Sequence, residues 1–83
     1  MAHVVRMIAF AGARDVLGAA ELDLTMPGPC SAAEVLEQVC ARWPALLPYR
    51  RSLRLAVNGA YAAPDDVVRG GDEVALIPPV AGG

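Results

Sequence analysis

Lysine is absent from this chain of 83 residues, and all seven basic residues are arginine. A protein without lysine cannot form a lysine Schiff base or use a side-chain amine as a nucleophile. It also has no side-chain amine that could react with an activated carboxyl group of the same chain. The formal net charge of -2 argues against a nucleic-acid binder, which needs a basic face. We therefore expect no nucleic acid among its partners.

Long apolar runs are also absent, although hydrophobic residues make up 55% of the chain and its mean hydropathy is +0.41. Charged residues interrupt the first apolar stretch, at Arg6, Arg14, Glu21 and Asp23, so no segment is long enough to span a bilayer. We expect no signal peptide, because residues 4–11 already have strand character. We thus predict one cytoplasmic domain, residues 1–83, with no membrane partner. We also expect part of its apolar surface to be covered by a protein partner.

Cysteine and histidine are scarce. If Ser31 opens a helix, Cys40 lies about 15 Å along its axis from Cys30, whereas a disulfide needs Cα atoms within about 7 Å. We predict two free thiols in a reducing compartment, with Cys40 packed as a small hydrophobe. The only histidine is His3, so no metal site is expected. Nothing is spaced as a nucleophile–base pair, which argues against a stand-alone enzyme.

Alternating apolar residues predict the strands. Residues 4–11 are apolar on both faces, with Val5, Met7 and Ala9 on one and Val4, Ile8 and Phe10 on the other, which indicates a central strand. Further strands are predicted at residues 21–26, 53–57, around Tyr61 and at 73–77. We expect a turn around Gly18 to join the first two strands as a hairpin, and Asn58-Gly59 to form another turn.

A single main helix is predicted from Ser31 to Trp43. Ser31 and Glu34 have the spacing of a capping box, and Pro44 ends the helix. The residues at helical spacing on its apolar face are Val35, Leu36, Val39, Cys40 and Trp43. We interpret Trp43 as a core anchor in preference to a ligand-stacking group. Residues 46–49 are predicted to be a connecting loop. Arg50, Arg51 and Arg54 form a solvated rim, with an anion contact as the alternative.

These elements predict an α+β fold in which the helix covers one face of a mixed sheet of four to five strands. A right-handed crossover would place the first and last strands side by side in the middle. Phe10, Ile8 and Ile77 would then lie close together on the uncovered face, joined by Tyr61. A partner surface is the favoured interpretation, and coverage by loops is the alternative.

The end of the chain is where we expect its chemistry. Pro78 and Pro79 keep the preceding segment extended, and Gly82 and Gly83 have no side chains. Such a thin end, carrying one carboxylate, can enter a channel that excludes larger residues. A frayed tail is the alternative. Because the tail follows a predicted strand without a spacer, we interpret it as anchored and directed.

Residues 71–83, Gly-Asp-Glu-Val-Ala-Leu-Ile-Pro-Pro-Val-Ala-Gly-Gly, resemble the C-terminus of the small subunit of molybdopterin synthase, the MoaD family. Residues 10–15 resemble the first strand and turn of that family, and residues 55–58 its third strand. The resemblance implies a β-grasp, ubiquitin-like fold and a sulfur carrier of molybdenum cofactor biosynthesis. It implies the non-catalytic, sulfur-donating subunit of the synthase, with no permanently bound cofactor.

The family chemistry would centre on Gly83. An E1-like enzyme would use ATP to adenylate its carboxylate, and a persulfide enzyme would supply sulfur for a thiocarboxylate. The tail, Gly82 included, would then enter the large subunit and give sulfur to cyclic pyranopterin monophosphate, within a heterotetramer of two small and two large subunits. By position, the resemblance assigns large-subunit contacts to Phe10, Tyr61 and Ile77 and to the tail residues Pro78, Pro79, Val80 and Ala81. It places Arg14 at the rim facing the activating enzyme.

Other functions remain open from the sequence alone. A sulfur carrier of the same fold could serve thiamine, cysteine or tRNA thiolation, because those carriers share the terminal Gly-Gly. A plain protein-interaction module with an inert tail is a different class. Leu76-Ile77 stands where some family members carry aromatic residues, which preserves apolar character and changes the shape offered to a partner.

Overall fold

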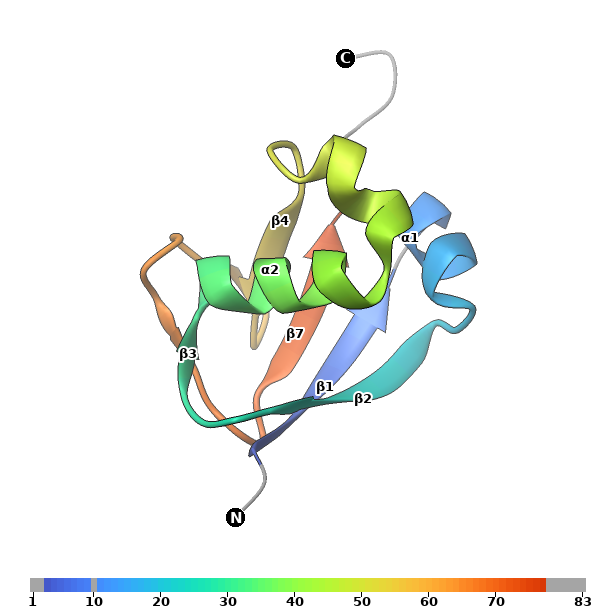
Figure 1. The fold of residues 1–83 in the computed structure, drawn as a ribbon. Coiled ribbons are helices and arrows are strands. Elements are labelled where there is room, and N and C mark those ends of the chain that lie inside the picture. The colour runs from blue at the N-terminus through green and yellow to red at the C-terminus, as the bar shows by residue number, and fades with distance from the viewer. Residues whose placement is uncertain (1–2, 10, 78–83) are drawn as a thin grey trace.

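The first and last strands of the chain lie side by side in the middle of a sheet, as predicted (Figure 1). The computed structural model describes residues 3–9 and 11–77. The elements are β1 (His3–Ala9), α1 (Ala11–Leu17), β2 (Glu21–Met26), β3 (Cys30–Ser31), α2 (Ala32–Arg42), η1 (Pro44–Tyr49), β4 (Arg54–Val57), β5 (Ala60–Tyr61), β6 (Val67–Val68) and β7 (Glu73–Ile77).

The main sheet has five strands in the order β2-β1-β7-β4-β5, and α2 crosses one of its faces. β1 and β7 are parallel, while β1–β2, β4–β7 and β4–β5 are antiparallel. β3 and β6 form a separate two-stranded sheet. The predicted α+β fold with a mixed sheet and one main helix is confirmed, and its topology is that of the β-grasp, ubiquitin-like class.

Alternation along the strands builds the core. In β1, Val5, Met7 and Ala9 are buried, and in β7 Val74 and Leu76 are fully covered. Successive side chains of a strand point to opposite faces, so the residues between them face away from the helix. No polar or charged side chain is buried among the residues that the structure describes. The side chains that fill the described core are therefore all apolar.

The capping box of α2 is present as predicted. The Ser31 side chain accepts a hydrogen bond from the Glu34 backbone N–H at 3.1 Å, and Ser31 N donates to the Glu34 carboxylate at 2.9 Å. Two otherwise unpaired amides at the helix start are thereby satisfied. Trp43 ends the helix and packs against the core while remaining half-buried, with the Arg42 guanidinium 4.6 Å above its ring.

The Asn58-Gly59 turn joins β4 to β5, as predicted. Both residues have positive φ, 51° and 88°, which is typical of a tight hairpin turn. Asn58 also fastens β7: its Oδ1 accepts from Glu73 N at 3.0 Å, and its Nδ2 donates to Asp72 at 3.1 Å. Asp72 accepts a further bond from Arg69 N, and these bonds lower the pKa of its carboxyl group. The turn thus fixes the start of the last strand.

Three predictions about connections were wrong. The first strand ends at Ala9, and the segment after it is helix α1, not a hairpin turn. Gly18, with φ of 78°, donates its N–H to Arg14 O at 2.9 Å, so the glycine that predicted a turn instead ends this helix. Residues 46–49 lie in the 3-10 helix η1, where Leu46 is buried. The short strands β3 and β6 were not predicted.

Candidate functional site

The face of the sheet opposite α2 is the first candidate surface. The register places Ile8 beside Ala75, Ala75 beside Ala56, and Ala56 beside Tyr61. We call these four residues the apolar row. Tyr61 is 74% exposed, and the other three are half-buried. In Figure 1, α2 and η1 lie on the near side of the sheet, and no described helix covers its far side. The predicted uncovered face is confirmed within residues 3–9 and 11–77.

Ile77 extends this surface at the end of β7. It lies opposite Arg54 of β4, is half-buried, and shares a face with Ala75 because the two are separated by one residue. The expected cluster of Ile8, Ile77 and Tyr61 therefore lies on one face, although Tyr61 is two strands away from β7. Phe10, the fourth expected member, lies outside the described residues.

The other end of the same face is charged. Arg6 lies between Asp23 of β2 and Glu73 of β7, and it forms an ion pair with Glu21. The hydrogen bond that Arg6 donates to the Glu21 carboxylate and the surrounding negative charges raise the pKa of the Arg6 guanidinium. The face is thus acidic near the start of β7 and apolar near its end. A partner that matches it would be apolar near Ile77 and basic farther away.

The tail follows β7, a strand that is paired on both sides. Leu76 is fully buried and lies between Ala9 of β1 and Leu55 of β4. β7 is therefore paired with β1 up to Leu76 and with β4 up to its end at Ile77. The expected donor residues Gly82 and Gly83, and the expected tail contacts Pro78, Pro79, Val80 and Ala81, lie outside the described residues.

Arg14 lies near the same end of the two central strands. β1 and β7 run parallel, so α1, which follows β1, begins beside the C-terminal end of β7. Arg14 is exposed in the last turn of α1 and lines a shallow depression with Asp15, Gly18 and Ala20. Its position is compatible with the expected role at a rim, and the contact itself stays a prediction.

The thiols contribute no reactive group to this surface. Cys30 and Cys40 are both free and Cys40 is buried, as predicted; Cys30 is buried as well. Cys30 Sγ donates to Gly28 O at 3.3 Å, and burial raises the pKa of the Cys40 thiol, so it stays protonated and unreactive. Across the described ranges, no group of three or more His, Cys, Asp or Glu residues could hold a metal ion. None of the described helices has both the length and the apolar character needed to cross a bilayer.

The strand order and the single crossing helix define a β-grasp protein of the ubiquitin-like class. Residues 7–83 match the ThiS family, and the chain belongs to that family. The resemblance to small subunits of molybdopterin synthase is also confirmed.

Two curated relatives cover nearly the whole chain. The molybdopterin synthase sulfur carrier subunit of Arabidopsis thaliana is 33% identical over 79 residues, which cover 95% of this chain and 82% of that protein. The subunit of the same name from Aedes aegypti is 36% identical over 88 residues, covering 95% and 88%. Among solved structures, SAMP1 from Haloferax volcanii superimposes with a TM-score of 0.77 at 27% identity, covering 96% of this chain and 99% of its own.

Proposed function

We propose that this protein is a sulfur carrier subunit of molybdopterin synthase, in which the Gly83 carboxyl group carries the sulfur. The observation that supports this most strongly is the similarity to curated sulfur carrier subunits over 95% of the chain. The geometry of the described residues agrees with it. β7 is paired with β1 as far as Leu76 and with β4 as far as Ile77, the last described residue before the expected reactive end.

A carboxylate requires activation before it can carry sulfur. With a pKa of about 3.5, a terminal carboxyl group is ionised at neutral pH and is a poor electrophile. In the proposed first step, a Gly83 oxygen attacks the α-phosphorus of ATP and pyrophosphate leaves, which produces an acyl adenylate. An E1-like partner enzyme supplies the catalytic groups and binds the ATP, so this chain needs no resident cofactor.

Sulfur then replaces the adenylate. The terminal sulfur of a persulfide on a donor enzyme attacks the acyl carbon, and AMP leaves. A thiol then cleaves the sulfur–sulfur bond, leaving a thiocarboxylate on Gly83 and a disulfide on the donor side. Gly82 and Gly83 leave this carbon unobstructed because neither has a side chain. The absence of lysine means that no side-chain amine of this chain can intercept the activated carbon.

The large synthase subunit is the proposed recipient. Its proposed contacts on this chain are Ile77, Tyr61 and Phe10, and residues 78–81 would occupy its entry channel. Cyclic pyranopterin monophosphate, bound there, would accept the sulfur. The half-buried Ile77 and the exposed Tyr61 support this assignment, since large apolar side chains on an uncovered face favour a protein interface. Arg14 is proposed to lie against the activating enzyme.

The test is the intact mass of the protein after reaction with its partners. Incubation with an E1-like activating enzyme, ATP and a persulfide donor should replace one oxygen by sulfur. Omission of ATP is the control and should leave the mass unchanged. An unchanged mass with active partners would refute the carrier function. Covalent attachment to other proteins, without the sulfur-bearing form, would instead indicate a modifier.

A further inference from the structure

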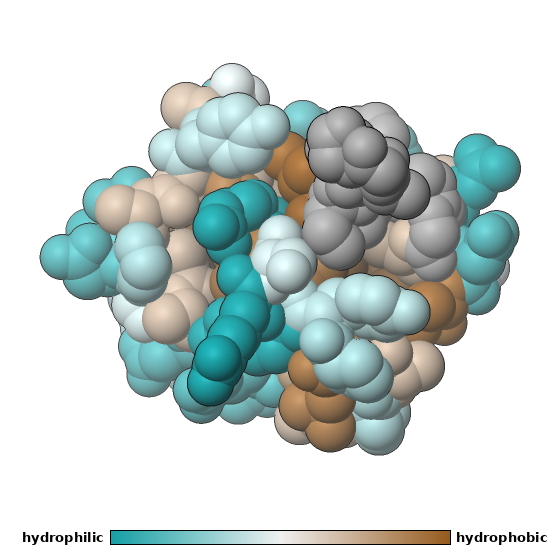
Figure 2. Space-filling model, turned by 90° about the horizontal axis from the view of Figure 1, so that it is seen from above, coloured by the Kyte–Doolittle hydropathy of each residue, from teal (hydrophilic) through white to brown (hydrophobic). Residues whose placement is uncertain are grey.

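A second surface lies on the helix side of the sheet, at the edge where η1 leads into β4. It is a groove whose floor includes the buried residues Leu36, Leu53 and Leu55. Ala33 of α2 and Ala62 after β5 also line it. Figure 2 looks down on this end of the molecule and shows strongly hydrophilic residues beside hydrophobic ones. The groove is thus apolar at its base and polar at its rim.

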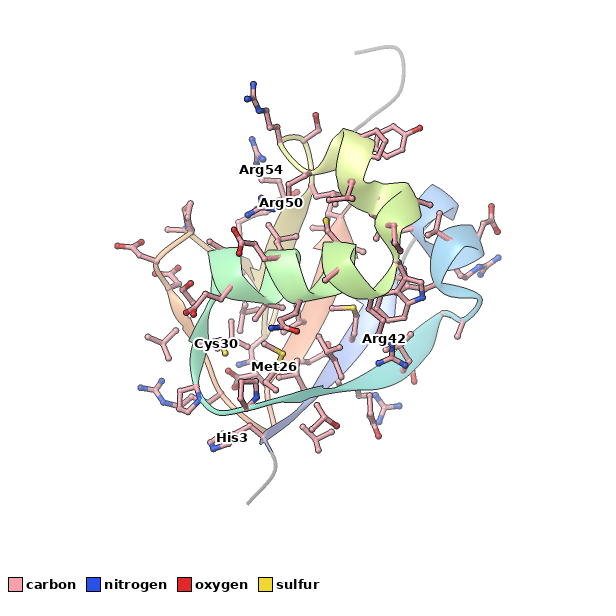
Figure 3. All side chains as sticks on the ribbon, in the orientation of Figure 1. His3, Met26, Cys30, Arg42, Arg50 and Arg54 are labelled. Carbon is pink, nitrogen blue, oxygen red and sulfur yellow. The ribbon has the colours of Figure 1, made fainter. Side chains whose placement is uncertain are left out.

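Three arginines form that rim. Arg50, Arg51 and Arg54 all line the groove, and Figure 3 shows Arg50 and Arg54 near one another beyond the start of α2. Arg50 donates to Ala33 O at 3.4 Å, and Arg54 donates to the carbonyl oxygens of Arg51 and Leu53 at 3.0 and 3.1 Å. These bonds engage backbone carbonyls and leave most of the five N–H donors of each guanidinium available.

None of these three arginines forms an ion pair with a carboxylate in the described part of the chain. The only ion pair there joins Arg6 to Glu21, on the other face of the sheet. Glu37 lines an adjoining groove together with Arg50, but the two form no ion pair. Three positive charges within five residues of sequence, in a protein of net charge -2, are a local exception. Their field favours an anionic group in or above the groove.

The composition of the groove favours a peptide over a free phosphate. The amides at the start of α2 are already used, because Ala32 N donates to Asp66 O and Ala33 N to Pro64 O, at 2.8 and 2.9 Å. The helix start therefore offers a phosphate no free donors from these residues. The apolar floor, in turn, gives a phosphate nothing to bind. An apolar side chain flanked by carboxylates fits both the floor and the rim.

We propose that this groove binds an extended acidic segment of a partner protein. One apolar side chain of that segment packs on Leu36, Leu53 and Ala62, and carboxylates on either side of it pair with the arginines of the rim. The floor of the groove lies on the helix side of the sheet, and the apolar row lies on the opposite side. Arg54 of the rim is paired with Ile77 at the end of β7, so the rim adjoins the outer face at this point. The proposal does not depend on sulfur transfer.

The test uses a labelled peptide and the full chain. The probe is an acetylated, amidated, fluorescein-labelled peptide with one leucine between two pairs of acidic residues, and its anisotropy reports binding. Binding should weaken as salt is raised. Arg51→Gln and Arg54→Gln should each weaken it about two- to fivefold, and the triple glutamine variant of the rim should show no binding. Arg42→Gln, at the far end of α2, is the charge-matched control and should bind like the unmodified protein.

Two further measurements separate the alternatives. Ala33→Met fills the groove without changing its charge and should also weaken binding, whereas a purely electrostatic association would be unaffected and would contradict the proposal. Amide chemical shifts should change near Ala33, Leu53 and Ala62. Changes confined to Ile8 and Ala75 would place the peptide on the outer face and overturn the proposal. Inorganic pyrophosphate that competed as strongly as the peptide would indicate an anion site instead.

Discussion

Leu76 and Ile77 are neighbours in sequence, but their side chains lie on opposite faces of the sheet. Leu76 is fully buried between β1 and β4 and fixes the end of β7 in the core. Ile77 faces outward and is half-buried, which leaves part of an isoleucine side chain for a partner to cover. A substitution at Leu76 should therefore act on stability, and one at Ile77 should act mainly on association.

Ile77→Asp tests this division. The aspartate would place an unpaired charge in the proposed interface with the large subunit. We therefore expect the dissociation constant of the complex to rise at least about tenfold, as is typical for a residue central to an interface. Isothermal titration calorimetry measures the affinity, and chemical denaturation measures the free energy of unfolding.

Two controls frame that result. Thr25→Asp makes the same kind of change on the outward, exposed side of β2, far from the apolar row, and should leave affinity unchanged. Leu76→Ala should lower the free energy of unfolding by about 2–5 kcal/mol through the cavity it creates. Normal affinity of Ile77→Asp for the large subunit would place the interface elsewhere.

At the level of elements, α2 depends on the pair at its first turn. Ser31 and Glu34 exchange hydrogen bonds, and those bonds lower the pKa of the Glu34 carboxyl group. A lowered pKa in the folded state means that the glutamate stabilises the fold above its unfolded pKa of about 4.3. This contribution is lost as the pH falls through the folded-state value. The capping box is therefore acid-sensitive.

Ser31→Ala should lower the free energy of unfolding by about 1 kcal/mol at neutral pH, because the Glu34 amide loses its acceptor. Thermal or urea denaturation measures this loss. Glu34→Gln keeps a hydrogen-bond acceptor without the charge, so its stability should depend less on pH than that of the unmodified protein between about pH 5 and pH 3. Parallel pH profiles for the two proteins would show that the capping box does not contribute in this way.

Elements with a strong local signal could be predicted from the sequence. The strand at 73–77, the Ser31 cap and the Asn58-Gly59 turn are specified by residues within a few positions of one another, and the structure confirms all three. The two-residue strands β3 and β6 exist only because Cys30 pairs with Val68, nearly forty positions away in sequence. α1 was missed because Gly18 signals a turn and a helix end equally well.

In the candidate site, too, some features follow from local sequence and others depend on contacts between distant residues. The outward positions of Ile8 and Ile77 follow from a period of two along each strand. The ion pair of Arg6 with Glu21 depends on the register between β1 and β2, which no local pattern supplies. The groove beside Arg50 likewise requires α2, β4 and the segment after β5 to meet. The importance of Gly83 came from its sequence motif, and it remains a prediction.

At the scale of the whole molecule, chain length sets the greatest distance that the proposed reactive carbon can have from the domain. β7 ends at Ile77, so six residues separate the core from the end of Gly83. At about 3.3–3.6 Å per residue, an extended tail would span at most about 20–22 Å. An active site built for that reach would not tolerate an added residue, because the carbon would no longer be terminal or correctly placed.

One serine appended after Gly83 should therefore abolish sulfur donation without changing the fold. The expected readouts are no thiocarboxylate at Gly83 by mass spectrometry and an unchanged melting temperature. A serine placed before Met1 is the control and should retain full donation. If the extended protein still supplied sulfur with the serine intact, the sulfur would have to be carried by another group.

The parallel pairing of β1 with β7 also governs when this protein can mature during synthesis. The strand in the middle of the sheet is translated after all the others, so a nascent chain that stops before Glu73 leaves β1 and β4 without the neighbour that each requires. Such long-range pairing delays folding until β7 has been synthesised. A product truncated before Glu73 would thus lack both the proposed reactive glycines and the middle strand of the sheet, and proteases should degrade it as an incompletely folded chain.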